Sequence, residues 1–208
     1  MFKELLNRYP ELKECANDIE QALKTMIDCH KNGGKILLCG NGGSCADCDH
    51  IVGELMKGFL KKRPLNEQKK NKMSTLSPTL TDEILEKLQT GLPAISLPSL
   101  TALNTAFCND VNPDLIYAQS VLGLAKPGDV FMGITTSGNA KNVNYAAAVA
   151  KGLGMKVIGL TGKTGGLLNS CADICIKVPQ TETYKIQELH LPVYHYLCAA
   201  IEKEFFEC

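Results

Sequence analysis

The sequence predicts an α/β fold in which a doubly wound, five-stranded parallel sheet is the middle of three layers. Short apolar segments alternate with longer segments whose apolar residues recur every three or four positions. Several of the short segments are apolar at every position, which is typical of parallel strands buried on both faces. The 208 residues suffice for one domain, 1–208.

Five apolar segments are the predicted strands: 35–39, 94–97, 129–135, 156–161 and 174–178. Amphipathic or alanine-rich segments are the predicted helices: 10–30, 44–59, 100–107, 113–123, 139–152 and 183–206. The N-terminal helix ends at Asn32-Gly33-Gly34, and Ser44 is placed to cap the next one. These patterns leave the order of the strands across the sheet open.

The alternation is interrupted at 61–92, where the chain is polar and begins with many lysines. This segment is too short and too polar to own a core, so we interpret it as a surface insertion with one short helix, at 81–89. Lys plus Arg and Asp plus Glu number 22 each. A neutral chain has no general attraction for nucleic acid or an anionic membrane, so we expect neither as a partner.

The sequence contains no apolar run of transmembrane length, and charge interrupts the apolar residues of its first six positions. We therefore expect a cytoplasmic protein. Its ten cysteines are scattered and mostly lie in apolar segments, which predicts reduced and buried thiols. Cys45 and Cys48 form a C-x-x-C motif, but no second such motif completes a zinc site, so we interpret them as structural.

Two glycine-rich turns each follow a predicted strand and precede a predicted helix. They are Gly40–Ser44 (G-N-G-G-S) and Thr135–Asn139 (T-T-S-G-N). Glycine lets the backbone approach a ligand closely, and N–H groups at a helix N-terminus attract an anion. Small hydroxyl residues also cap helices, so one such turn has an ordinary structural interpretation. Two of them in one sheet favour a phosphate-binding site.

His50 and Glu54 are four residues apart on the second predicted helix, so their Cβ atoms lie ~6 Å apart on one face. This spacing suits an acid/base pair or two ligands of one metal ion, and it is also the spacing of a surface ion pair. His50 is under two turns from the Gly40–Ser44 turn, so the pair is predicted to overlook a ligand bound there.

The last predicted helix carries Gln187, His190 and His195. Gln187 and His195 lie within a quarter turn of each other but ~12 Å apart along a regular helix, which is long for two ligands of one ion. Either the first turn of this helix is irregular or the site combines residues from different chains. His190 is ~140° from His195 around the helix, so we interpret it as a surface or supporting histidine.

The motifs G-N-G-G-S, D-x-x-H-x-x-x-E, N-D, T-T-S-G-N, T-G-K-x-G-G and I-Q-E-x-H-x-x-x-x-H occur in this order. With them the chain resembles the sedoheptulose-7-phosphate isomerases (phosphoheptose isomerases) of the sugar-isomerase (SIS) domain superfamily, outside about 61–92. The resemblance implies a flavodoxin-like SIS fold and a homotetramer with active sites between subunits. It also implies one zinc or other divalent ion in each site.

The resemblance further implies a role for each matching residue. The implied metal ligands are His50, Glu54, Gln187 and His195. The implied acid/base pair is Glu54 and His195. The implied substrate contacts are Asn41, Gly42, Gly43, Ser44, Asn109, Asp110, Thr135, Thr136, Ser137 and Gln187. The chain departs from the family pattern at Ala140, where a further phosphate-binding serine is common, and at Tyr184, where an acidic residue is frequent.

The implied reaction is the conversion of sedoheptulose 7-phosphate to D-glycero-D-manno-heptose 7-phosphate through an enediol(ate). Such a reaction needs a group that shuttles a proton and a group or metal that stabilises an oxyanion. One alternative is a non-catalytic SIS protein that binds a phosphosugar or a protein partner, and another is an isomerase of a different phosphosugar. A binding module has no use for the complete set of implied metal ligands, so the set favours an enzyme.

Overall fold

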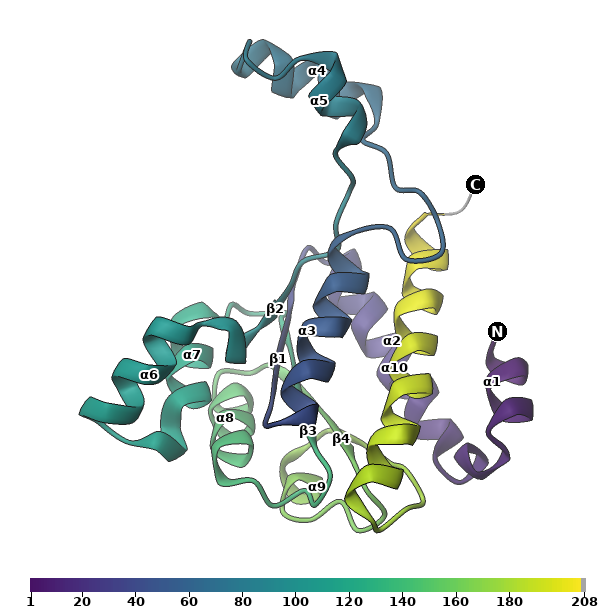
Figure 1. Cartoon of the computed structure of the whole chain (residues 1–208), viewed down its shortest axis with the longest axis vertical. Helices are drawn as coiled ribbons and strands as arrows, with labels where there is room; N and C mark the ends of the chain where they lie inside the picture. Colours follow the sequence, from purple (N-terminus) through teal and green to yellow (C-terminus); the bar gives the residue numbers. More distant parts are fainter. Residues whose placement is uncertain (207–208) are drawn as a thin grey trace.

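The computed structural model describes residues 1–206 and contains one sheet with helices on both faces (Figure 1). Its five parallel strands are β1 (Ile36–Gly40), β2 (Ala94–Ser96), β3 (Val130–Thr135), β4 (Lys156–Thr161) and β5 (Ile174–Lys177). They lie in the order β2-β1-β3-β4-β5. The predicted five-stranded parallel sheet is confirmed, and the order is that of flavodoxin-like folds.

Each face of the sheet has its own hydrophobic core. The helices on one face are α2 (Ala16–Lys31), α3 (Gly43–Met56) and α10 (Thr183–Phe205), and those on the other are α7 (Ile116–Leu124), α8 (Lys141–Gly152) and α9 (Leu168–Cys171). Ile36 and Leu38 of β1 belong to the first core, and Leu37 and Cys39 to the second. Because successive strand residues face opposite sides, a strand covered on both must be apolar throughout.

The N-terminal region adds two elements beside α10. Helix α1 (Phe2–Arg8), which the sequence patterns did not predict, comes first. The helix predicted at 10–30 begins as a 3₁₀ helix, Pro10–Cys15, and becomes α-helical only at Ala16. Proline lacks an N–H and is favoured in a first turn, which suits this start. Leu12, Cys15, Ile19 and Met26 of this segment are buried.

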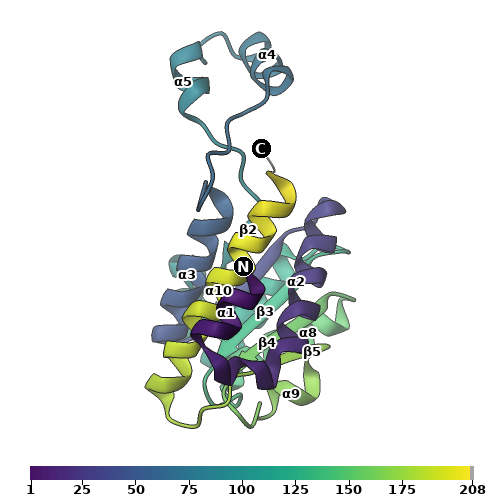
Figure 2. The same ribbon diagram turned by 90° about the vertical axis from the view of Figure 1, so that its right-hand side faces the viewer.

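The insertion stands clear of the sheet and its helices (Figures 1 and 2). It contains α4 (Glu67–Leu76) and α5 (Asp82–Lys87). Helix α5 confirms the predicted short helix, whereas α4 was not predicted. Helix α4 buries no residue, so it has no apolar periodicity from which it could be recognised. It begins at Asn66, whose side chain accepts a hydrogen bond from the Lys69 N–H.

Helix α6 (Thr101–Asp110) also has no buried residue and lies on the side of α3 away from α10 (Figure 1). Short 3₁₀ helices, Leu97–Ser99 and Pro113–Leu115, connect it to β2 and to α7. The helices predicted at 100–107 and 113–123 are therefore confirmed with small shifts of their ends. The exposed face of α6 carries Leu103, which is 39% exposed.

The prediction of buried thiols is confirmed for six cysteines: Cys15, Cys29, Cys39, Cys48, Cys175 and Cys198. Burial raises the pKa of Cys15 and Cys198 to about 12, so these side chains are inert hydrophobic groups at neutral pH. Cys48 of the C-x-x-C motif is buried as well, which fits its structural interpretation. Cys208 lies outside the described residues. Within 1–206, no helix is both long and apolar enough to cross a membrane.

Candidate active site

A cavity lies where β1 and β3 end side by side. Because the chain leaves these neighbouring strands toward opposite faces of the sheet, the turns that follow them form a crevice at the switch point. The cavity has a volume of about 340 Å³. Its lining residues are Asn41, Gly42, Gly43, Ser44, Ile134, Thr135, Thr136, Ala140, Thr183 and Gln187. The structure thus brings the two predicted turns together with Gln187 of α10.

Glycine is required at two positions of these turns. A Cβ atom on Gly43 would lie 2.4 Å from Nε2 of Gln187, so only glycine lets this side chain approach the first turn. Gly138 has φ +71°, and a Cβ there would lie 2.0 Å from the carbonyl oxygen of Gly165. The second turn is therefore packed against the T-G-K-x-G-G segment, which holds its shape.

Ser44 lies inside α3 instead of capping it. The N-cap residue is Gly42, with φ 56°, and no side chain caps this helix end. The prediction that Ser44 caps the helix is therefore wrong, because the helix begins one residue earlier, at Gly43. Ser44 is buried and lines the cavity, and its N–H donates to the carbonyl oxygen of Asn41 at 3.0 Å. The start of the helix still presents its partial positive charge to an anion in the cavity.

Asn41 is fixed by side chains that sequence reasoning missed. Its amide exchanges two hydrogen bonds of 2.9 Å with the amide of Asn142. The Tyr117 hydroxyl donates to the carbonyl oxygen of Gly40 at 2.9 Å and to Oδ1 of Asn41 at 3.2 Å. Asn142 follows the T-T-S-G-N motif by three residues. This nearness to the motif was the one sequence signal that could have indicated it. These contacts fix the rim of the cavity before any ligand binds.

Ser137 lies in the second turn but does not line the cavity. Its side chain is exposed, and its Oγ accepts a hydrogen bond from the Asn139 N–H at 3.1 Å. Thr135 and Thr136 of the same turn do line the cavity. Of the predicted hydroxyl groups, the structure therefore places Ser44, Thr135 and Thr136 together.

A second polar cluster lies between α3 and α10. Nε2 of His50 is 3.4 Å from Oε1 of Glu54, as the four-residue spacing predicted. The rings of His50 and His195 meet edge to face with their centres 5.0 Å apart. Glu54 is mostly buried, and its Oε2 and Nε2 of His195 have no hydrogen-bond partner in the described chain. Oε2 of Glu54 is 3.7 Å from Nζ of Lys57, so within 1–206 Nε2 of His195 is the buried atom of this pair that has no polar partner.

The surroundings of His195 lower the pKa of its imidazole. Burial and the nearby His50 lower its pKa, and the Glu54 carboxylate opposes them only in part. The Phe59 ring lies 5.6 Å from the His195 ring, centre to centre. A more apolar cavity of about 530 Å³, between α1 and α10, opens onto His195 from the other side. An imidazole beside a carboxylate is suited to exchanging a proton with a bound ligand.

His50 is supported by a series of hydrogen bonds that sequence reasoning also missed. The Tyr194 hydroxyl lies 3.0 Å from Nδ1 of His50 and donates to Oδ1 of Asp47 at 3.2 Å. A hydroxyl that donates to Asp47 can accept from Nδ1 of His50, which fixes the orientation of the ring with Nε2 toward Glu54. Asp47 is the aspartate of the D-x-x-H motif, and this motif was the available signal.

The four implied metal ligands do not come together in one chain. Gln187 lies at the cavity, and His195 lies two turns further along α10, as the helix geometry predicted. Imidazole and carboxylate suit zinc, and the 3.4 Å between His50 and Glu54 with the unpartnered Nε2 of His195 fits this donor chemistry. Still, no three His, Cys, Asp or Glu side chains within 1–206 are arranged to enclose an ion.

The structure does not bring Asn109 and Asp110 to the cavity. They end α6, where both are exposed and the Asn109 amide donates to Oδ1 of Asp110 at 2.8 Å. Helix α6 lies on the far side of α3 from α10 (Figure 1).

His190 is fully buried, so of its two interpretations, a surface or a supporting histidine, the surface one is wrong. Burial lowers its pKa to about 4, and the nearby Thr161 backbone opposes this only in part. The helical angle correctly placed it away from His195, but α10 is covered on that face by the sheet, so the face is core and not solvent.

A flavodoxin-like sheet with a hydroxyl-rich crevice at its switch point and a histidine–carboxylate cluster beside it defines an SIS-domain protein. The family model described as "SIS domain" matches residues 2–89 and 85–162. A phosphoheptose isomerase of Aneurinibacillus thermoaerophilus is 37% identical over 188 residues, 90% of this chain and 82% of the relative. The chain therefore belongs to the phosphoheptose isomerase family of SIS-domain proteins.

Two solved structures agree with this assignment. A phosphoheptose isomerase from Francisella tularensis superposes with a TM-score of 0.77 at 32% identity. The match covers 97% of this chain and 94% of the Francisella chain. The phosphoheptose isomerase from Neisseria gonorrhoeae gives a TM-score of 0.76 at 32% identity, with coverage of 97% and 95%. The similarity thus extends over nearly the full length of both relatives.

Proposed function

We propose that this protein is an aldose–ketose isomerase that converts sedoheptulose 7-phosphate to D-glycero-D-manno-heptose 7-phosphate. One observation carries the proposal: the hydroxyl-rich cavity and the Glu54–His195 cluster lie on the same two packed helices, α3 and α10. Relatives that match nearly the whole chain bear the name phosphoheptose isomerase. A module that only binds sugar needs the cavity but not the cluster.

The cavity is the place for the phosphate. It offers N–H groups at the start of α3 and the hydroxyls of Ser44, Thr135 and Thr136. These neutral donors bind an anion without a counter-charge that must itself be desolvated. The phosphate supplies binding energy remote from the reacting carbons, and this energy positions them.

The spacing along α3 favours a long sugar. From Ser44 the helix rises ~9 Å to His50 and ~15 Å to Glu54. In a seven-carbon ketose phosphate the phosphate is on C7 and the reacting carbons are C1 and C2, at the opposite end of the chain. The phosphate can therefore occupy the cavity while C1 and C2 reach the polar cluster.

Glu54 and His195 are the proposed proton shuttle. One group removes a proton from C1 of the ketose, which leaves an enediol(ate), and a proton is returned to C2. The O1 hydroxyl gives up its proton and O2 gains one, so the product is an aldose with no net change in composition. A mostly buried carboxylate and an imidazole whose pKa is lowered by burial suit these steps, because neither is fully hydrated.

Thr136→Val tests the phosphate site. The substitution keeps the side-chain shape and removes the hydroxyl from the cavity. We expect KM for sedoheptulose 7-phosphate to rise roughly 10- to 100-fold, the cost of one hydrogen bond to a charged group. Binding of unphosphorylated sedoheptulose should be unchanged. An equal loss for both sugars would show that Thr136 does not contact the phosphate. Ser74→Ala, on the exposed α4, is the matched control.

We also propose that each active site holds one divalent ion, zinc, with His50, Glu54 and His195 among its ligands, which requires these side chains to move from their present arrangement. When bound there, the ion would polarise the oxygen atoms of the substrate as a Lewis acid. Protein purified without chelator should contain about one zinc per chain, and His50→Ala should contain little. The readout is metal content by mass spectrometry. Full activity of metal-free protein in chelator would contradict this proposal.

A homotetramer with shared sites is the proposed assembly. Its support is the position of Asn109 and Asp110 on α6, away from the cavity of their own chain. In a closed oligomer, such a projecting helix can reach the site of a neighbour. Gln187 and His195 can likewise belong to one site only if the ligand spans two turns of α10 or if a neighbour completes it.

Turnover of a panel of ketose phosphates tests the substrate. The panel contains sedoheptulose 7-phosphate, fructose 6-phosphate and ribulose 5-phosphate. The spacing of the cavity and the cluster predicts the highest kcat/KM for the seven-carbon sugar. A higher kcat/KM for a five- or six-carbon sugar would mean that the protein is an isomerase of a different substrate. No turnover of any of the three sugars would favour a binding protein.

A further inference from the structure

A buried ion pair ties the base of the insertion to the two helices of the candidate active site. Nε of Arg63 donates to Oε1 of Glu202 at 2.8 Å, and the two side chains are 0% and 1% exposed. Arg63 is the residue just before the outer part of the insertion, and Glu202 is in the last turns of α10.

Both charges are satisfied by further hydrogen bonds. Nη1 of Arg63 donates to the carbonyl oxygen of Leu55 at 2.6 Å, and Nη2 donates to that of Glu54 at 3.0 Å. The Glu202 carboxylate accepts three backbone N–H groups, from Phe59, Leu60 and Lys61, at 2.8, 2.7 and 3.1 Å. We call this set the Arg63–Glu202 clamp.

The clamp acts directly on the positions of the acid/base groups. Glu54 lies in the last turn of α3, where the carbonyl oxygens have no partner within the helix. The Arg63 side chain donates hydrogen bonds to two of them, those of Glu54 and Leu55. Glu202 follows His195 by seven residues, so both lie on nearly the same face of α10, ~10 Å apart. The loop that Glu202 holds also places the Phe59 ring against His195.

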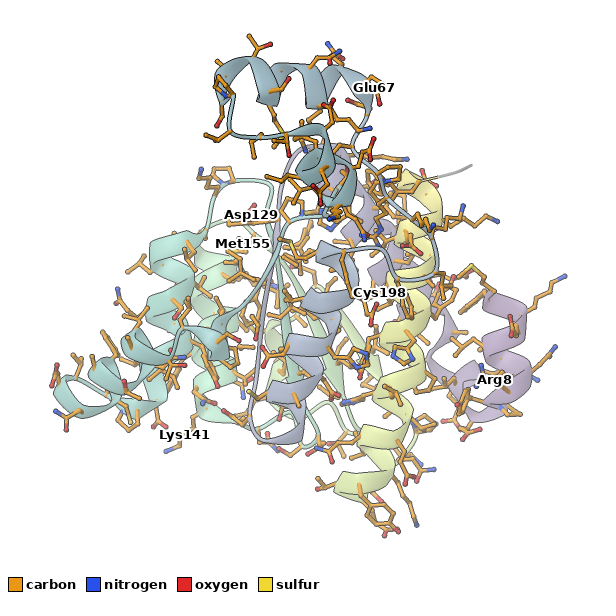
Figure 3. The ribbon with its side chains drawn as sticks, turned by 45° about the horizontal axis from the view of Figure 1, so that its top comes forward. Arg8, Glu67, Asp129, Lys141, Met155 and Cys198 are labelled. Carbon is orange, nitrogen blue, oxygen red and sulfur yellow. The ribbon has the colours of Figure 1, made fainter. Side chains whose placement is uncertain are left out.

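The rest of the insertion is separate from the clamp. Its two ends pair with each other: Pro64 bridges Gln89, and the Thr90 N–H donates to the carbonyl oxygen of Arg63 at 2.7 Å. Beyond this closure, α4 and α5 extend away from the molecule, with Glu67 far from Cys198 of α10 (Figure 3). The base of the insertion therefore belongs to the catalytic domain, whereas its tip does not.

From these contacts we propose that Arg63 and Glu202 are positioning residues of the isomerase. They hold the Glu54 end of α3 against α10, which keeps Glu54, His50 and His195 at their working distances. Stability alone does not explain the pair, because apolar side chains can fill a buried site at no greater cost than two desolvated charges. Hydrogen bonds to the Glu54 and Leu55 carbonyl oxygens are directional, so they fix the position of this end of α3 more narrowly than apolar packing would. The proposal rests on the proposed isomerase function.

The test compares Arg63→Met and Glu202→Gln with Lys35→Met. Lys35, which is partly buried, pairs with the buried Asp129 just before β1 and β3, so its variant also leaves a buried carboxylate without its cation, in a place outside α3 and α10. All are assayed below their melting temperatures. We expect the clamp variants to lose kcat on the order of 10²-fold, as for a displaced catalytic group. KM should change little, since the phosphate cavity is at the other end of α3. Lys35→Met should keep its kcat.

A second measurement tests the clamp without relying on turnover. Amide hydrogen exchange in the last turn of α3 should be faster in Glu202→Gln than in Lys35→Met. A chain in which a short glycine-serine linker replaces residues 66–87 should behave as wild type in both the kinetic and the exchange assay. Unchanged kcat and unchanged exchange in the clamp variants would overturn the proposal, as would an equal loss of kcat in Lys35→Met. If the wild-type protein turns over no sugar phosphate, the proposed function fails, and the exchange data alone then decide on the clamp.

Discussion

Glu54→Gln and His195→Ala are each expected to lower the turnover of sedoheptulose 7-phosphate by ~10²–10⁴-fold, the usual cost of losing an acid/base group. Gln keeps the size of the Glu54 side chain but cannot carry the proton. Ala removes the one imidazole of the cluster whose pKa is lowered by burial. The effect should fall on kcat, because the phosphate cavity of α3 and β3 is left intact. Steady-state kinetics on purified, folded protein measures it.

The control for both variants is Glu83→Gln, on α5 of the insertion. Glu83 is exposed and pairs with Lys87, so its loss removes a carboxylate of equal charge at a remote place. Its turnover should equal that of the wild type. Rates within a few-fold of wild type for both Glu54→Gln and His195→Ala would remove these two residues from the mechanism, even if the protein proved to be an isomerase.

Mixing two inactive variants is expected to restore activity. If each site takes Glu54 from one chain and Asp110 from a neighbour, Glu54→Gln and Asp110→Asn are each inactive alone. Random reassembly of equal amounts then leaves about a quarter of the sites with both wild-type residues. We expect close to that fraction of wild-type activity after the mixture is dissociated and reassembled. The physical reason is the exposed position of Asp110 at the end of α6.

Two results would count against shared sites. If both residues came from one chain, every site of every mixed oligomer would carry one substitution, and the mixture would stay inactive. If light scattering gave the mass of a monomer for the active wild-type protein, no sharing would be possible. Reassembly of each variant with itself is the control for recovery of folded protein.

The sheet and its crevice followed from the sequence because burial leaves a clear pattern. A strand such as Ile36–Gly40 is covered on both faces, so every position is selected to be apolar. The first turn requires glycine because of its backbone conformation and because Gln187 approaches it closely. A structural requirement for glycine can be recognised in the sequence. His50 and Glu54 were paired correctly because a helix fixes the geometry of residues four apart.

The remaining features depend on contacts between distant parts of the chain. Arg63 stands in a lysine-rich run and looked like a solvated charge, yet its partner Glu202 is 139 residues away. Tyr194 and Asp47, which support His50, are separated by 147 residues. His190 faces the core because the sheet covers that side of α10, and α4 has no apolar side to reveal it. None of these contacts has a local pattern.

The product formed from sedoheptulose 7-phosphate is the most direct test of the proposed isomerase. Purified protein is incubated with this ketose phosphate, and proton NMR follows the region where the hydrogen on C1 of a cyclic aldose resonates. We expect new anomeric signals of D-glycero-D-manno-heptose 7-phosphate, which grow until the mixture reaches equilibrium. The same final mixture should form when the reaction is started from the aldose. A substrate spectrum that stays unchanged with folded, zinc-supplied protein would contradict the account.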